Sequence, residues 1–71
     1  MKPEVSEKYR QNPNCEMRLG VASWANGNDA IKSFKFTSFD VNGKPTRMGE
    51  MPVEALPQAL EFAIREGYIT L

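Results

Sequence analysis

Basic and aromatic side chains alternate through the middle of this chain, and they are its best candidates for chemistry. They are Arg18, Trp24, Lys35, Phe39 and Lys44. Aromatic rings on an exposed sheet stack with unpaired bases, at about 1–3 kcal/mol per base, while cations contact the phosphates. On a shared sheet face, these residues would form a site for single-stranded nucleic acid. Alternatively, Trp24, Phe39 and Met48 form the buried face of a sheet-to-sheet dimer, because large apolar patches rarely stay exposed.

Residues suited to catalysis are scarce. The chain has no histidine for acid–base work, and its one cysteine, Cys15, has no evident activating neighbour. Glu50 and Glu54 are close in sequence, but we assign the first to a strand and the second to a solvated helix face. The glycines form no phosphate-binding motif, and a lone thiol without histidine does not support a zinc site. We therefore expect a non-enzymatic binding protein without a cofactor or a metal.

Length and charge limit the possible partners. The 71 residues form one small domain, and chains of this size bury only about 60% of their unfolded surface. Because a single cysteine excludes an internal disulfide, self-association is the leading way to complete the core. Nine Lys and Arg balance nine Asp and Glu, so only a local cluster of cations would attract nucleic acid. The lone cysteine and the lack of an apolar signal or spanning segment predict a cytoplasmic protein without membrane association.

Two Asn-Gly steps, Asn26-Gly27 and Asn42-Gly43, divide the strand-forming part of the chain. Asn and Gly tolerate positive φ at low cost, so this dipeptide is a strong signal for a tight hairpin turn. The two steps predict three antiparallel strands in a meander, at about residues 15–25, 30–41 and 44–51. The fold class is therefore α+β, with three strands followed by one helix.

The first 14 residues differ in composition from the rest. They contain two prolines and alternating charges with little apolar content, so we predict a flexible arm over residues 1–14. Residues 15–71 then form the single folded domain. Alternatively, the arm becomes ordered on a partner through Lys8, Tyr9 and Arg10.

The second Asn-Gly step suggests how its two strands pair. A two-residue turn at Asn42-Gly43 sets Lys35 opposite Glu50 and Phe39 opposite Thr46. The pairing of Lys35 with Glu50 places opposite charges across the ladder, which favours this register.

The register of the first hairpin depends on the length of its loop. A four-residue loop pairs Leu19 with Phe36, whereas a five-residue loop sets Arg18 opposite Phe36. A slip of one residue moves every side chain to the other face of the sheet. We choose the four-residue loop because it gathers the apolar residues on one side: Met17, Leu19, Val21, Phe34, Phe36 and Met51.

A helix is predicted near the C-terminus. Its apolar residues recur at helical spacing, at Leu56, Ala59, Leu60, Ala63 and Ile64. Pro57 is tolerated in a first helical turn, and Gly67 supplies a left-handed stop. We expect this apolar stripe to pack on the sheet face that carries Phe34 and Phe36.

Three apolar residues lie outside the stripe, and we take them as the candidate dimer interface: Phe62, Tyr68 and Ile69. Phe62 either reaches the sheet edge beside Tyr68 or marks a contact with a second subunit. The tail of residues 68–71 is β-prone, so it would add an edge strand, pack beneath the helix or pair with another subunit.

The layout resembles the positive-cofactor-four-like family of single-stranded DNA-binding proteins, over about residues 18–64. The similarity rests on Ser23-Trp24-Ala25-Asn26-Gly27 at the first turn, on an aromatic and basic second strand, and on Met48-Gly49-Glu50-Met51-Pro52-Val53 before the helix. The resemblance implies a homodimer whose curved sheets cradle single-stranded DNA. The positions that it implies as DNA contacts are Trp24, Lys35, Phe39, Lys44 and Arg47.

Two kinds of function remain open. The first is a dimeric module for single-stranded DNA or RNA, connected with transcription, replication or repair. The second is a small protein-interaction or inhibitor-type accessory factor of bacteria or phages. A third option is a structural dimer in which both sheet faces are buried by the fold itself. Nucleic-acid binding predicts steep salt dependence and cations that cluster without intervening acids, namely Arg18, Lys32, Lys35, Lys44 and Arg47. A protein partner predicts apolar burial and weak salt dependence.

Overall fold

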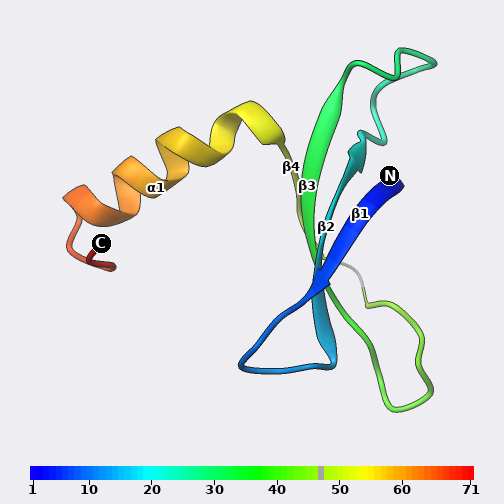
Figure 1. Cartoon of the computed structure of the whole chain (residues 1–71), viewed down its shortest axis with the longest axis horizontal. Helices are drawn as coiled ribbons and strands as arrows, with labels where there is room; N and C mark the ends of the chain where they lie inside the picture. The colour runs from blue at the N-terminus through cyan, green and yellow to red at the C-terminus, as the bar shows by residue number, and fades with distance from the viewer. Residues whose placement is uncertain (47) are drawn as a thin grey trace.

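The computed structural model describes residues 1–46 and 48–71, and it has an antiparallel sheet followed by a C-terminal helix (Figure 1). The α+β class is confirmed, but the described residues form four strands rather than three. Their order in the sheet is β1-β2-β3-β4, so neighbours in sequence are neighbours in space. The elements are β1 (Lys2–Lys8), β2 (Cys15–Val21), β3 (Lys32–Ser38), β4 (Glu50–Pro52), the 3-10 turn η1 (Val53–Ala55) and α1 (Leu56–Arg65).

The additional strand, β1, comes from the segment that we predicted to be a flexible arm over residues 1–14. It pairs with β2 from Lys2↔Val21 to Lys8↔Glu16, with a register shift between Pro3 and Val5. Every residue of β1 is exposed, so no apolar periodicity marks the strand in the sequence. Its ladder consists of backbone hydrogen bonds, which form regardless of side-chain polarity.

Gly20 allows β1 to lie close to β2. A Cβ built on Gly20 would lie 2.8 Å from the Cα of Pro3 and closer still to the carbonyl oxygen of Lys2. We therefore expect Gly20→Ala to displace the start of β1, at a cost of about 1–3 kcal/mol of unfolding free energy. Gly49→Ala is the control, because a Cβ there has no neighbour within 4 Å. Hydrogen exchange should show lost protection of β1 amides in the first variant only, and equal protection in both would contradict this role of Gly20.

The first hairpin has a longer loop than the four residues predicted. Leu19 pairs with Phe34, and Met17 pairs with Phe36, so Leu19 lies two residues from its predicted partner. The loop over residues 22–31 contains three consecutive turns and closes with a hydrogen bond from the Ala22 amide to the Ile31 carbonyl, at 2.9 Å. Because a two-residue shift preserves the alternation of side chains, each residue of the strand still lies on the sheet face predicted for it.

The second hairpin confirms part of the predicted register. Lys35 pairs with Glu50 as expected, but Phe39 bridges to Pro45 instead of Thr46. A type I′ turn needs positive φ at both central residues, whereas the described turn has it at Gly43 (φ 77°) and not at the preceding Asn42. The Asp40 carboxylate explains the longer turn, since its Oδ1 accepts hydrogen bonds from the amides of Asn42 (2.9 Å) and Lys44 (3.0 Å).

The helix has the ends that the sequence predicts. Pro57 lies in its first turn, where the proline nitrogen needs no hydrogen-bond partner. Gly67 has φ of 80°, and the amides of Gly67 and Tyr68 bond back to the carbonyls of Ile64 and Ala63. This arrangement is the Schellman stop that a C-terminal glycine favours.

The helix does not pack on the sheet of its own chain, which corrects our expectation that it would cover Phe34 and Phe36. In Figure 1 it extends away from the sheet, and Leu60 and Ile64 on its apolar stripe are 41% and 39% exposed. The physical reason lies in the connection, because β4, η1 and α1 follow one another without a loop that would turn the helix back. The radius of gyration is 13.6 Å, above the about 11 Å of a compact domain of this length.

The buried core is correspondingly small. Its central cluster contains Val21, Ala22 and Ala25, with Ile31 packed against it. This cluster lies where the 22–31 loop meets the sheet, whereas Leu19 and Met51 on the apolar sheet face are exposed. In the described part of the chain, no helix has the length and apolar character needed to cross a membrane.

Candidate nucleic-acid interface

The strand register places two of the predicted cations on one face of the sheet. Arg18 on β2 pairs with Lys35 on β3, which pairs with Glu50 on β4. Directly paired residues of antiparallel strands project to the same side, so these three form a row across the sheet. We call this side the polar face. Leu19, Phe34 and Met51 form the next row and therefore lie on the opposite, apolar face.

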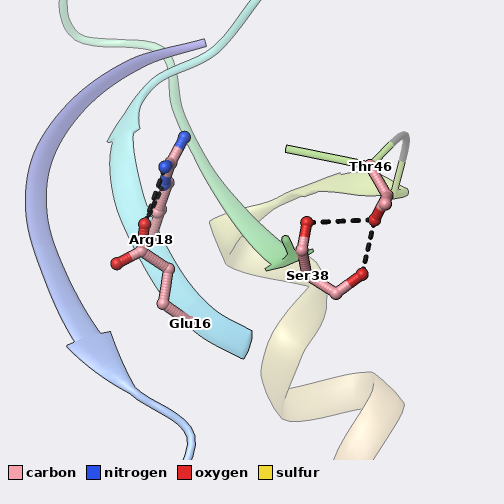
Figure 2. A network of polar contacts seen from close by, with 4 residues as sticks. All are labelled: Glu16, Arg18, Ser38 and Thr46. Carbon is pink, nitrogen blue, oxygen red and sulfur yellow. Dashed lines mark hydrogen bonds and ion pairs between the residues drawn. The ribbon is translucent and has the colours of Figure 1, made fainter. Parts of the chain in front are cut away.

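Arg18 is held in place by two neighbours. Its guanidinium donates to Oε1 of Glu16 from Nη2 at 2.6 Å and from Nε at 2.9 Å (Figure 2). The same guanidinium lies over the ring of Phe39, 5.7 Å from its centroid. Arg18 and Phe39, which we predicted separately as nucleic-acid contacts, therefore contact each other. Sequence reasoning missed Glu16, although its spacing of two residues from Arg18 on a strand places both side chains on one face.

Lys35 is half-buried and, among the described residues, takes part in no ion pair. Its cross-strand partner Glu50 is engaged elsewhere. Glu50 Oε2 accepts hydrogen bonds from the Ser33 hydroxyl at 2.6 Å and from the Ser23 amide at 2.9 Å. The predicted pairing of Lys35 with Glu50 is thus correct, but the carboxylate binds two serines and leaves the ammonium of Lys35 available to an anion.

The environment of Glu50 favours its ionised form. Burial raises the pKa of Glu50, but the hydrogen bonds from the Ser33 hydroxyl and the Ser23 amide outweigh it, and the positive N-terminus adds to them. The pKa of Glu50 therefore lies below its usual value. Hydrogen bonds to a carboxylate stabilise the charged form in this way.

The remaining predicted contacts lie at the two ends of the sheet. Trp24 belongs to the 22–31 loop and is 45% exposed, whereas Phe39 and Lys44 belong to the hairpin at the other end of β3 (Figure 1). Lys44 is exposed, and Arg47 lies outside the described residues. The seven residues of β3 separate the two ends by about 20 Å, at about 3.3 Å per residue.

The second hairpin is closed at its base by Ser38 and Thr46. The Thr46 hydroxyl donates to the Ser38 carbonyl at 3.0 Å and also meets the Ser38 hydroxyl (Figure 2). The Thr46 amide donates to the same carbonyl at 2.7 Å. These contacts orient the loop that carries Lys44 relative to the sheet.

The cations do not form an acid-free cluster. Arg18 pairs with Glu16, and Lys32 pairs with Glu4 at 2.9 Å. Lys32 also pairs in register with Val21, which places it on the apolar face, away from Lys35. The polar face therefore presents a mixed surface on which Lys35 is the cation without an acidic partner among the described residues, while Lys44 is exposed in the hairpin beyond the end of β3.

The described residues contain no group of three or more acidic or cysteine side chains that would hold a metal ion. The dimer candidates Phe62, Tyr68 and Ile69 are all exposed in the single chain. Phe62 lies beneath the guanidinium of Arg65, 5.5 Å from its ring centroid. No protein-family model, curated protein or solved structure matches this chain, so the case for a function comes from its residues and their geometry.

Proposed function

We propose that this chain is a dimeric module that binds single-stranded nucleic acid across its polar face. The observation that carries the proposal is the contact of Arg18 with Phe39 beside Lys35. An aromatic ring and two cations at one point of an open sheet suit stacking with a base and attraction of its phosphate. Trp24 and Lys44 extend this surface to the two ends of the sheet.

A second copy of the chain would complete the fold. The helix stripe is half-exposed, while the apolar sheet face has a groove of about 190 Å³ that includes Val5, Met17, Leu19 and Phe34 in its lining. Because the helix extends away from the sheet (Figure 1), these two surfaces do not meet within one chain. We infer that the helix of each copy packs on the apolar face of the other, which leaves both polar faces open to ligand.

Salt dependence tests the nucleic-acid proposal. A labelled single-stranded DNA should bind at low salt, and its affinity should fall as salt rises, by about 0.7 log units per log unit of salt for each phosphate contact. With Lys35 and Lys44 as principal contacts and Arg18 already paired, we expect a slope between about −1 and −2. Fluorescence anisotropy at several salt concentrations measures this slope, and an absence of binding at low salt would refute the proposal.

A matched pair of lysines provides the control. Lys35→Ala should weaken DNA binding and make the slope shallower by about 0.7, because Lys35 lies on the polar face. Lys32→Ala makes the same change of charge on the same strand but on the other face, so it should leave the slope unchanged. Equal effects of the two substitutions would show that binding follows net charge rather than this face.

Binding to a protein is the second candidate, and the ion pairs favour it. Because Glu16 and Glu4 neutralise two of the five cations in the predicted cluster, the surface is less basic than DNA binding alone requires. A chain that fails to bind DNA or RNA at low salt while its dimer leaves the polar face open would support this second function.

A further inference from the structure

Glu50 connects three parts of the polar face. It comes from β4, yet its Oε2 meets the hydroxyl of Ser33 on β3 and the amide of Ser23 in the loop after β2. Ser33 is fully buried, so its hydroxyl has a fixed position and Glu50 is held from that side. Ser23 directly precedes Trp24, the only tryptophan of the chain.

The Ser23 amide takes its hydrogen-bond partner from outside its own turn. The turn over residues 22–25 closes with a hydrogen bond from the Ala25 amide to the Ala22 carbonyl, at 3.0 Å. The backbone groups of Ser23 and Trp24 take no part in this bond, and both residues are exposed to solvent. Ala25, by contrast, is buried in the small core. We call residues 23–25 the Trp24 corner. It is held on both sides of Trp24, because Ala25 is buried in the core and the amide of Ser23 is bound by Glu50.

We propose that Glu50 is a positioning residue that fixes the Trp24 corner beside the row of Arg18 and Lys35, so that the ring is preorganised for stacking. Its consequence for ligand binding rests on the proposed function. Preorganisation improves affinity because the ring does not have to be ordered when the ligand binds. Glu50 remains an anion on this face, and its two donors hold the carboxylate in place against Ser33 and Ser23.

The hydrogen bonds from Ser33 and Ser23 keep Glu50 ionised at neutral pH, and the positive N-terminus adds to them. Lys35 faces Glu50 from β3, Arg18 lies one strand further in the same row, and the N-terminus acts from the side of β1. The acidic group on the neighbouring η1 is Glu54. Because the pKa of Glu50 is lower in the folded chain than its usual 4.5, its stabilising effect is complete above that pH. The stabilisation by Glu50 is then lost as the pH falls through the pKa that Glu50 has in the folded chain.

Trp24 fluorescence tests the positioning directly, without any ligand. Glu50→Ala should increase quenching of Trp24 by acrylamide and lower its fluorescence anisotropy, whereas Glu54→Ala should change neither. The parent chain should show the same change when the pH falls through the lowered pKa of Glu50, and Glu50→Ala should already show it at pH 7. Unchanged Trp24 fluorescence in a folded Glu50→Ala chain would overturn the proposal.

Two further measurements keep the outcomes distinct. If Glu50→Ala does not fold, Ser33→Ala removes one of its two partners and should produce a smaller change of Trp24 quenching in the same direction. Oligonucleotide affinity should fall about tenfold in Glu50→Ala, but Glu50→Ala should cause no further fall in a chain that already carries Trp24→Ala. A change of fluorescence in a chain that binds no oligonucleotide would sustain the positioning role and refute the proposed function.

Discussion

Leu60→Glu is expected to prevent dimer formation. Leu60 lies in the centre of the helix stripe and is 41% exposed in the single chain, so the proposed dimer buries it against the apolar sheet face. An unpaired carboxylate in such a contact costs several kcal/mol, which corresponds to at least about a hundredfold weaker association. Sedimentation at concentrations where the parent is dimeric should show the 8.0 kDa monomer.

Gln58→Glu is the matched control for this substitution. It adds the same charge to the same helix, but Gln58 lies on the side opposite the Leu60 stripe at 100° per residue. Its association should equal that of the parent. Because a small core makes folding depend on association, the melting temperature of the parent should also rise with concentration. A monomeric parent with a concentration-independent melting temperature would contradict the proposed dimer.

Trp24→Ala is expected to cause the largest loss of nucleic-acid binding. A stacked base contributes about 1–3 kcal/mol, so the dissociation constant should rise by between about fivefold and a hundredfold. The ring is 45% exposed, so its removal should leave the helix signal in circular dichroism and the melting temperature nearly unchanged. Anisotropy with labelled single-stranded DNA measures the loss.

Trp24→Phe serves as the conservative variant, because it retains an aromatic face and should recover most of the lost affinity. Phe39→Ala should also weaken binding, but by a smaller factor, since the ring already contacts Arg18. Unfolding of the Trp24→Ala chain would show that the ring belongs to the core. Unchanged affinity in a folded Trp24→Ala chain would remove Trp24 from the site.

The features that were predictable from sequence are those with a local cause. Gly67 ends the helix because a residue without Cβ adopts positive φ at little cost, and Pro57 fits the first turn because no donor is needed there. The pairing of Lys35 with Glu50 was also correct, although the details of the turn were not. The Asp40 side chain, which bonds two amides of that turn, was the signal that the prediction overlooked.

The errors concern features without a pattern in the side chains. β1 forms through backbone hydrogen bonds along a strand whose residues are all exposed, so it has no apolar alternation to detect. The two-residue shift of the first hairpin arises from three consecutive turns in its loop, whose number cannot be counted from Asn26-Gly27 alone. The partners of the candidate site, Glu16 and Glu50, depend on which atoms the register brings within hydrogen-bond distance.

The sequence by itself determined the α+β class, the apolar stripe of the helix and the sharing of one face by Arg18 and Lys35, because side-chain period and turn residues act over short distances. Only the tertiary structure decided that the helix leaves its own sheet, that Arg18 contacts Phe39, and that Glu50 binds serines rather than Lys35. These outcomes depend on distances between segments far apart in the chain, and such distances follow from strand register and the direction of each connection rather than from any local pattern.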